Sequence, residues 1–203
     1  EFNVINTLLL VMLTPLIVKI VTKVVPSRSS EDEEFRLQHI SIGLLSTAEL
    51  SLLQAKKEIV NYAKRTYKMY GFFKELFVET NDKKFNELFE RIEKYEDISD
   101  RVEVEIATYL TKISSHDLSE ESSRRLQAMF NIINDIESVS DSNYNLAKTL
   151  RRKRKLNIWF NQEVRDNLNH MFKLADDAYQ IMLNNLDAGY HNINLGPAYE
   201  AEE

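Results

Sequence analysis

The sequence predicts an all-α protein, an antiparallel helical bundle preceded by a transmembrane helix. Three observations lead to this fold class. The 203 residues include only 4 Gly and 3 Pro, which leaves little material for turns. Apolar residues recur at alternating spacings of three and four along several long segments, as they do in helices that pack along one face. No alternating pattern typical of a strand extends over a useful length.

The first element is a mostly apolar run, FNVINTLLLVMLTPLIVKIVTKVV, at residues 2–25, which is long enough to cross a bilayer. Lys19 and Lys23 lie near its C-terminal end, and this position favours a cytoplasmic location for the residues that follow. An amphipathic surface helix or a buried core helix is the alternative. We expect residues 1–26 to form a transmembrane helix of a longer membrane protein, and residues 27–41 to form a polar linker.

Residues 42–190 contain four segments with the apolar seam of a helical bundle. Asn81 or Asp82 is the expected N-cap of the second segment, Ser119 caps the third and Asn161 the fourth. The first two connections are short, which predicts antiparallel neighbours. The expected core residues are Leu45, Ala48, Leu52, Ala55, Ile59, Tyr62, Thr66, Met69, Phe73 and Leu76 in the first segment; Phe85, Leu88, Ile92, Tyr95, Val102, Ile106 and Ile113 in the second; Leu126, Met129, Ile133, Ile136, Ala147 and Leu150 in the third; and Val164, Leu168, Met171, Ala175, Ala178 and Met182 in the fourth.

Two further features follow the third seam. The basic run RRKRK at residues 151–155 suits a solvated helix end, where cations complement the helix dipole. If the chain is attached to a membrane, the same run could contact anionic headgroups instead. Residues 191–203 are expected to be a loop and the start of a truncated helix, with Pro197 near its first turn.

Composition excludes several functional classes. The absence of Cys rules out disulfides, thiolate metal sites and a cysteine nucleophile. The net charge of -6 argues against a general nucleic-acid binder. The sequence contains no His-Glu-x-x-His motif, no glycine-rich phosphate loop and no Gly-x-Ser-x-Gly motif. Packing accounts for Trp159 and the 9 Tyr. We therefore expect a protein that is not an enzyme.

Acidic pairs lie where two of the apolar seams turn polar. Glu96 and Asp100 flank Ser99 in the second segment, and Glu137 and Asp141 form the same Glu-x-x-x-Asp spacing in the third. Acids four residues apart share a helix face and repel one another, so they should face either water or a cation. Oxygen-only ligands suit hard cations such as Mg²⁺, Ca²⁺, Mn²⁺ or iron. The spacing leaves a solvated face and a cation site both open.

Several stretches, in the same order along the chain, resemble one family. LLSTAELSLLQAKKEI (44–59), YEDISDRVEVEI (95–106) and DIESVSDSNYNLAK (135–148) resemble the phosphate-uptake regulator family, PhoU. They are most similar to the PhoU-like domain at the C-terminus of bacterial sodium/phosphate cotransporters. FNVINTLLL (2–10) resembles the start of the last transmembrane helix of those transporters.

The resemblance implies an antiparallel bundle made of one three-helix repeat and the start of a second. It implies a non-catalytic regulatory domain on the cytoplasmic side of the bacterial inner membrane, after a last transmembrane helix at residues 1–26. The implied partners are the rest of the transporter membrane domain, the membrane itself, and a regulatory protein or a second copy of the chain. Nucleic acid is not among them.

The resemblance also implies a metal site. The implied ligands are Glu96, Asp97, Asp100 and Glu103 in the second segment, and Glu137 and Asp141 in the third. A divalent or trivalent cation (Mg, Mn, Fe, Zn or Ca) would be the cofactor. The family's Glu-Arg-Ile-Gly-Asp core reads ESVSD at residues 137–141, so its Arg and Gly are replaced while both carboxylates are kept. The alternative is a membrane-tethered helical interaction or scaffold module whose acids are only solvated.

Overall fold

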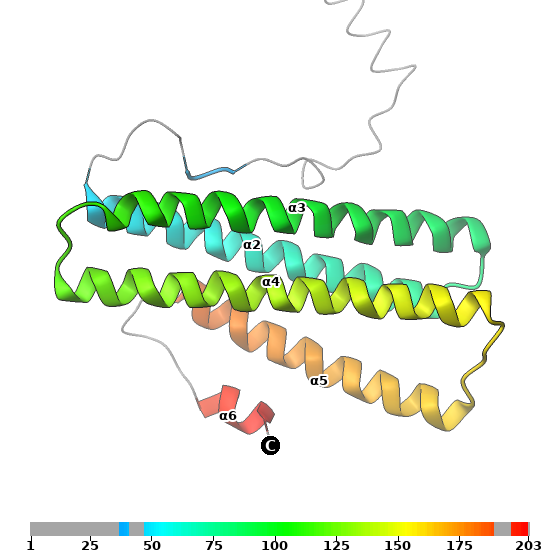
Figure 1. The fold of residues 1–203 in the computed structure, drawn as a ribbon. Coiled ribbons are helices and arrows are strands. Elements are labelled where there is room, and N and C mark those ends of the chain that lie inside the picture. Colours follow the sequence, from blue (N-terminus) through cyan, green and yellow to red (C-terminus); the bar gives the residue numbers. More distant parts are fainter. Residues whose placement is uncertain (1–36, 41–46, 189–195, 203) are drawn as a thin grey trace, which may run out of the picture. The chain divides into compact units, whose positions relative to one another are not determined.

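The computed structural model describes residues 37–40, 47–188 and 196–202 (Figure 1). The described residues form the helices α2 (Ala48–Val78), α3 (Asp82–Ser114), α4 (Glu120–Lys155), α5 (Gln162–Asp187) and α6 (Gly196–Glu202), and they include no strand. The connections between successive long helices lie at alternate ends, so neighbouring helices run antiparallel (Figure 1). The predicted all-α bundle is confirmed.

Each long helix begins at a polar side chain that accepts a hydrogen bond from a backbone N–H of the first turn. Three of these caps, at Asn81, Ser119 and Asn161, are those that the sequence predicts. Thr47 caps α2, which begins at Ala48, and Leu45 of the predicted seam lies outside the described residues. The four cap distances are 3.2 Å from Leu50 N to Thr47 Oγ1, 3.1 Å from Lys84 N to Asn81 Oδ1, 3.1 Å from Ser122 N to Ser119 Oγ, and 2.9 Å from Val164 N to Asn161 Oδ1.

The helix α2 lies at the centre of the bundle and contacts α3, α4 and α5. It buries residues on more than one face for this reason, including Val60 and Tyr70, which lie outside the predicted seam. The seams of α3 and α4 are buried as predicted, and Leu88 is partly buried. Two apolar clusters result, one around Ile59 and Ile106 and the other around Phe73 and Phe89. Burial of such side chains provides the main driving force for folding.

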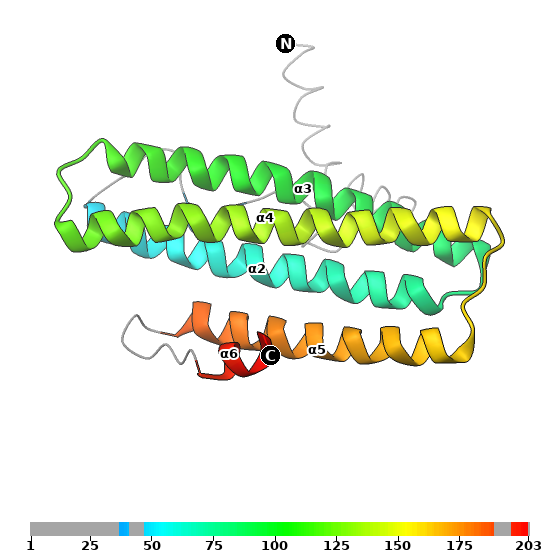
Figure 2. The ribbon, with the colours of Figure 1, turned by 60° about the horizontal axis from the view of Figure 1, so that its bottom comes forward.

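The predicted seam of α5 is wrong in part. Tyr179 is the one residue of α5 that is buried, whereas Val164, Met171 and Ala178 of the predicted seam are exposed. Of the other long helices, α5 runs along α2 and packs mainly against it (Figure 2), and it also contacts the short helix α6. One long neighbour and one short helix cover a narrower stripe than the several long neighbours of a helix in the bundle centre, so part of the apolar face of α5 stays open to solvent.

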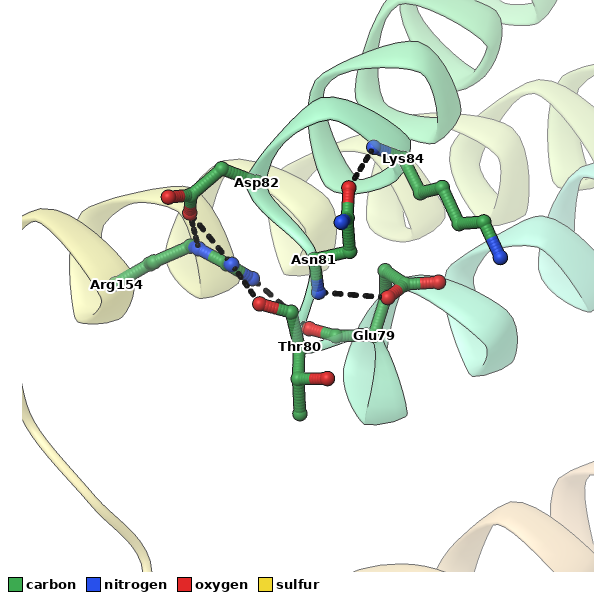
Figure 3. Close-up of polar contacts among 6 residues, drawn as sticks. All are labelled: Glu79, Thr80, Asn81, Asp82, Lys84 and Arg154. Carbon is green, nitrogen blue, oxygen red and sulfur yellow. Dashed lines mark hydrogen bonds and ion pairs between the residues drawn. The ribbon is translucent and has the colours of Figure 1, made fainter.

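Arg154, from the last turn of α4, holds the turn between α2 and α3 (Figure 3). Its guanidinium donates to the carbonyl oxygens of Glu79 (2.8 Å) and Thr80 (2.5 Å), and Nε and Nη2 donate to Asp82 Oδ1 at 2.9 and 2.6 Å. The last turn of α2 has no basic residue of its own. Arg154 therefore supplies from another helix the cation that helix C-termini favour.

A short segment before α2 is also bound to the bundle. Glu58, which is 3% exposed, accepts hydrogen bonds from the backbone N–H groups of Gln38 (3.0 Å) and His39 (2.8 Å). Leu37 and Ile40 pack against the nearby core cluster. Residues 37–40, which belong to the predicted linker, are therefore held against the bundle.

None of the helices in the described ranges combines the length and apolarity that crossing a bilayer requires. The transmembrane helix predicted at residues 1–26 lies outside the described residues.

Candidate metal centre

The packing of α3 against α4 brings three acidic side chains together. Glu96 and Asp100 lie one turn apart on α3, and Asp141 lies on α4. Each offers one carboxylate oxygen, and these oxygens all lie within 4.8 Å of one another. Glu96 is half-buried, while Asp100 and Asp141 are exposed. We call these three residues the acidic cluster.

Ser99, Ser140 and Asn143, where the two seams turn polar, are buried and have partners inside the bundle. Ser99 donates to the hydroxyl of Tyr62 at 3.0 Å, and Ser140 lies with its Oγ 3.4 Å from the Met69 sulfur. Asn143 donates to the Tyr179 hydroxyl at 3.0 Å. These side chains satisfy one another, so the seams turn polar without exposing the core to water. The three carboxylates of the acidic cluster are half-buried or exposed, so a cation could reach them.

The acidic cluster concentrates negative charge. Burial is the main cause that raises the pKa of Glu96, followed by the charges of Asp100, Asp97 and Asp141, with Lys148 acting in the opposite direction. Burial, followed by the charges of Asp141 and Asp97, raises the pKa of Asp100. The folded protein therefore disfavours the ionised form of both groups, and a bound cation would relieve this repulsion.

The other predicted ligands surround the cluster without joining it. Burial, and then the charges of Asp141, Glu103 and Asp100, raise the pKa of Glu137. Glu137 and Glu103 are half-buried, and Asp97 is exposed on α3. Of the six predicted ligands, the structure brings Glu96, Asp100 and Asp141 within reach of one ion. The remaining three contribute to the negative field around it.

A polar contact at one side of the cluster was not predicted. Tyr144 donates to Glu93 Oε1 at 2.7 Å, and this hydrogen bond is the first cause that raises the pKa of Tyr144 to about 12. Lys148 Nζ lies 4.3 Å from the centroid of the Tyr144 ring. Tyr144 and Lys148 follow Asp141 by three and seven residues, so helical spacing could have placed them on the same face of α4. Glu93 is thus engaged and lies outside the acidic cluster.

The donor set fits a hard cation. Mg²⁺ commonly keeps several waters and binds through one or two carboxylates, and Ca²⁺ also takes oxygen ligands. Three carboxylates, two of them exposed, would leave room for water on the remaining positions. Zn²⁺ fits less well, because its structural sites are closed by four ligands that are mostly Cys and His.

The fold and the cluster define an all-helical bundle with an oxygen-only acidic site between two of its helices. Residues 59–150 match the family model of the PhoU domain. The match runs from within α2 to near the end of α4 and includes all the predicted ligands. This part of the chain is similar to the PhoU domain. No curated protein and no solved structure matches the chain.

Proposed function

We propose that the chain is a non-catalytic regulatory domain of phosphate transport, attached to a bacterial sodium/phosphate cotransporter on the cytoplasmic side of the inner membrane. The observation that supports the regulatory role is the PhoU match, because the matched region contains the complete acidic cluster. The resemblance of residues 2–10 to a last transmembrane helix supports the link to the transporter.

The proposed mechanism links the two helices of the cluster. Glu96 and Asp100 would hold a hard cation from α3, and Asp141 would hold it from α4. When bound, the cation supplies the positive charge that offsets repulsion among the carboxylates. Glu58 connects the same bundle to Gln38 and His39, which follow the apolar run in sequence. A change in bundle stability would therefore reach the segment that leads to the membrane.

Thermal unfolding tests the metal site. The whole 203-residue chain, purified in a nonionic detergent and treated with chelator, is heated with and without Mg²⁺, Mn²⁺, Fe²⁺, Zn²⁺ and Ca²⁺. Ligand binding to the folded state at 100 times Kd adds about 2.7 kcal/mol, so Tm should rise with cation concentration. Asp100→Asn combined with Asp141→Asn should abolish the rise. Glu90→Gln combined with Asp135→Asn is the matched control, because both residues are exposed acids on the same helices outside the cluster.

The alternative, an interaction module with a solvated acidic face, has one observation in its favour. Met171 and Leu174 on α5 are 61% and 51% exposed, as they would be on a helix that binds a protein partner. On this alternative no cation shifts Tm, and the double Asn variant is slightly more stable than the parent because repulsion is relieved. The same melting curves distinguish the two functions.

Transport requires a separate test in the full-length transporter. Deleting residues 42–203 should change phosphate uptake or its regulation. Unchanged uptake and regulation would separate this domain from transport, whatever the melting experiment shows.

A further inference from the structure

A cavity of about 560 Å³ lies at the end of the bundle where the α2–α3 turn meets the connection between α4 and α5. It shares no residue with the acidic cluster. Its volume falls within the range of about 300–1,000 Å³ that is typical of small-molecule sites. Aromatic and cationic side chains line much of it, chief among them Phe77, Trp159, Phe160, Lys153, Arg154 and Arg165.

The aromatic wall results from the way α4 ends. Asn157 has a φ of 52°, the left-handed conformation of a helix C-terminus. Ile158 N–H donates to the Lys153 carbonyl at 3.1 Å, and Asn157 N–H donates to the Arg154 carbonyl at 3.0 Å, which completes a Schellman motif. This reversal of the chain brings Trp159 and Phe160 back beside Lys153. The Lys153 Nζ lies 4.5 Å from the ring centroid of Phe160 and 5.6 Å from that of Trp159.

Trp159 is not a packing residue, which corrects the sequence-based prediction. It is 75% exposed, although a tryptophan gains more than most side chains from burial. Phe160, next to it, stacks on Phe77 from α2, with ring centroids 6.3 Å apart. The cavity therefore has an apolar wall with a large aromatic ring at its edge that the described residues do not cover.

Two of the three cations at the cavity have no acidic partner among the described residues. Arg154 is fully engaged by the α2–α3 turn and forms part of the wall. Lys153 contacts only aromatic faces among the interactions described for its side chain, and Arg165 donates to the Phe160 carbonyl at 3.2 Å. Burial, and then the charges of Arg165 and Arg154, lower the pKa of Lys153. An anion between Lys153 and Arg165 would relieve that repulsion.

The acids at the cavity do not compete for this position. Asp82 is paired with Arg154, and Glu79 Oε1 accepts from the backbone N–H of Asn81 at 2.7 Å. Both carboxylates are thus engaged on the turn (Figure 3). What remains at the cavity is the positive charge of Lys153 and Arg165 beside the exposed ring of Trp159.

We propose that this cavity binds a small aromatic organic phosphate, with its phosphoryl group between Lys153 and Arg165 and its ring against Trp159 and Phe160. A phosphoryl group carries up to two negative charges and several acceptor oxygens, which match an ammonium and a guanidinium. Inorganic phosphate would leave the aromatic wall without a partner, and a neutral ring would leave the two cations without one. The site lies outside the acidic cluster, so the inference goes beyond the regulatory function proposed above.

Intrinsic fluorescence tests the proposal, because Trp159 is the sole tryptophan of the chain. The 203-residue chain is titrated with adenosine monophosphate, adenosine and inorganic phosphate, with excitation at the red edge of tryptophan absorption. Adenosine monophosphate should change the emission saturably. Adenosine and inorganic phosphate should each bind at least about tenfold more weakly. Adenosine lacks the phosphoryl group that would contact the two cations, and inorganic phosphate lacks the ring that would contact the aromatic wall.

Variants with equal loss of charge locate the site. Lys153→Met with Arg165→Gln should weaken the binding of adenosine monophosphate at least about tenfold. Arg152→Gln with Lys155→Gln is the control, since both residues are exposed, belong to the same basic run and lie outside the cavity. The control should change the affinity less than about twofold. Arg165→Gln alone, at an exposed position, serves if the double variant does not fold.

Three results would overturn the proposal. The first is the absence of a saturable change with adenosine monophosphate. The second is equal affinity for adenosine monophosphate and inorganic phosphate, which would indicate a site for free phosphate. The third is equal weakening in the control variant, which would indicate only a general effect of the basic run.

Discussion

Asp100 illustrates how a single residue couples the acidic cluster to stability. Its carboxylate lies beside Glu96 on α3 and Asp141 on α4, and the pKa of both Asp100 and Glu96 is raised above the ordinary values of 3.8 and 4.5. A carboxyl group with a raised pKa in the folded state binds its proton more tightly than in the unfolded chain. The stability gained from that proton is present below the unfolded pKa and is lost as pH rises through the folded pKa.

The first prediction concerns the pH dependence of stability, measured in chelator so that no metal ion is bound. Between about pH 4 and neutral pH, the free energy of unfolding of the parent should fall relative to that of Asp100→Asn, which has no carboxyl group to ionise. At neutral pH the variant should be more stable by a few tenths of a kcal/mol for each like-charge pair that it removes. Urea unfolding at several pH values measures the difference. Parallel pH profiles for the two proteins would contradict the prediction.

Glu58 provides the second prediction at this scale. Its buried carboxylate accepts from the amides of Gln38 and His39, so Glu58→Ala should cost about 1–3 kcal/mol of unfolding free energy. Hydrogen exchange at those two amides should become faster in the variant. Glu75→Ala is the control, because Glu75 is an exposed acid on the same helix. Unchanged exchange at both amides would show that the segment before α2 is held by Leu37 and Ile40 alone.

At the scale of the element, the α2–α3 turn depends on a side chain from α4. The ion pair between Arg154 and Asp82 contributes little by itself, because Asp82 is 89% exposed and water screens the charges. The bonds to the carbonyl oxygens of Glu79 and Thr80 matter more, since they satisfy groups at the end of α2.

The third prediction separates these two contributions. Arg154→Met should lower the free energy of unfolding by about 1–3 kcal/mol, while Asp82→Asn should change it by less than about 0.5 kcal/mol. Chemical denaturation measures both values. Arg152→Met, at an exposed position of the same helix end, controls for the loss of charge. Equal effects of Arg154→Met and Asp82→Asn would mean that the ion pair, and not the carbonyl bonds, holds the turn.

At the scale of the whole molecule, the sequence predicts what is local or periodic. The caps at Asn81, Ser119 and Asn161 depend on a few neighbouring residues, and the seams of α3 and α4 depend on helical spacing. The pair Glu96 and Asp100 is predictable for the same reason. Each of these features follows from one helix considered alone.

The sequence does not predict how separate helices align. Asp141 joins the acidic cluster while Glu137, one turn earlier, does not, because the register of α3 against α4 decides which turn of α4 faces Asp100. The family resemblance implies both Glu137 and Asp141 as ligands and does not indicate which of them lies near Asp100. The sequence predicts a solvated helix end for Arg154 and packing for Trp159, and both differ in the structure because their surroundings come from the α2–α3 turn and the α4 terminus. Such contacts depend on tertiary packing.

The arrangement of the helices leads to a fourth prediction, that α2, α3 and α4 form the cooperative unit. These three helices contact one another pairwise and extensively, whereas α5 contacts only α2 substantially among them and has one buried residue, Tyr179. A chain that ends at Asn157 should therefore unfold cooperatively and keep any cation-dependent rise in Tm, because the acidic cluster lies within α3 and α4. Its Tm should be lower, since loss of Tyr179 and its neighbours uncovers apolar side chains of α2 worth about 1.5–3 kcal/mol each when fully exposed.

Circular dichroism during heating measures both effects, with a chain that ends at Ala188 as the control for removal of α6. Non-cooperative melting of the shorter chain would show that α5 is required for the bundle to fold, and that the PhoU match at residues 59–150 does not delimit an independent unit.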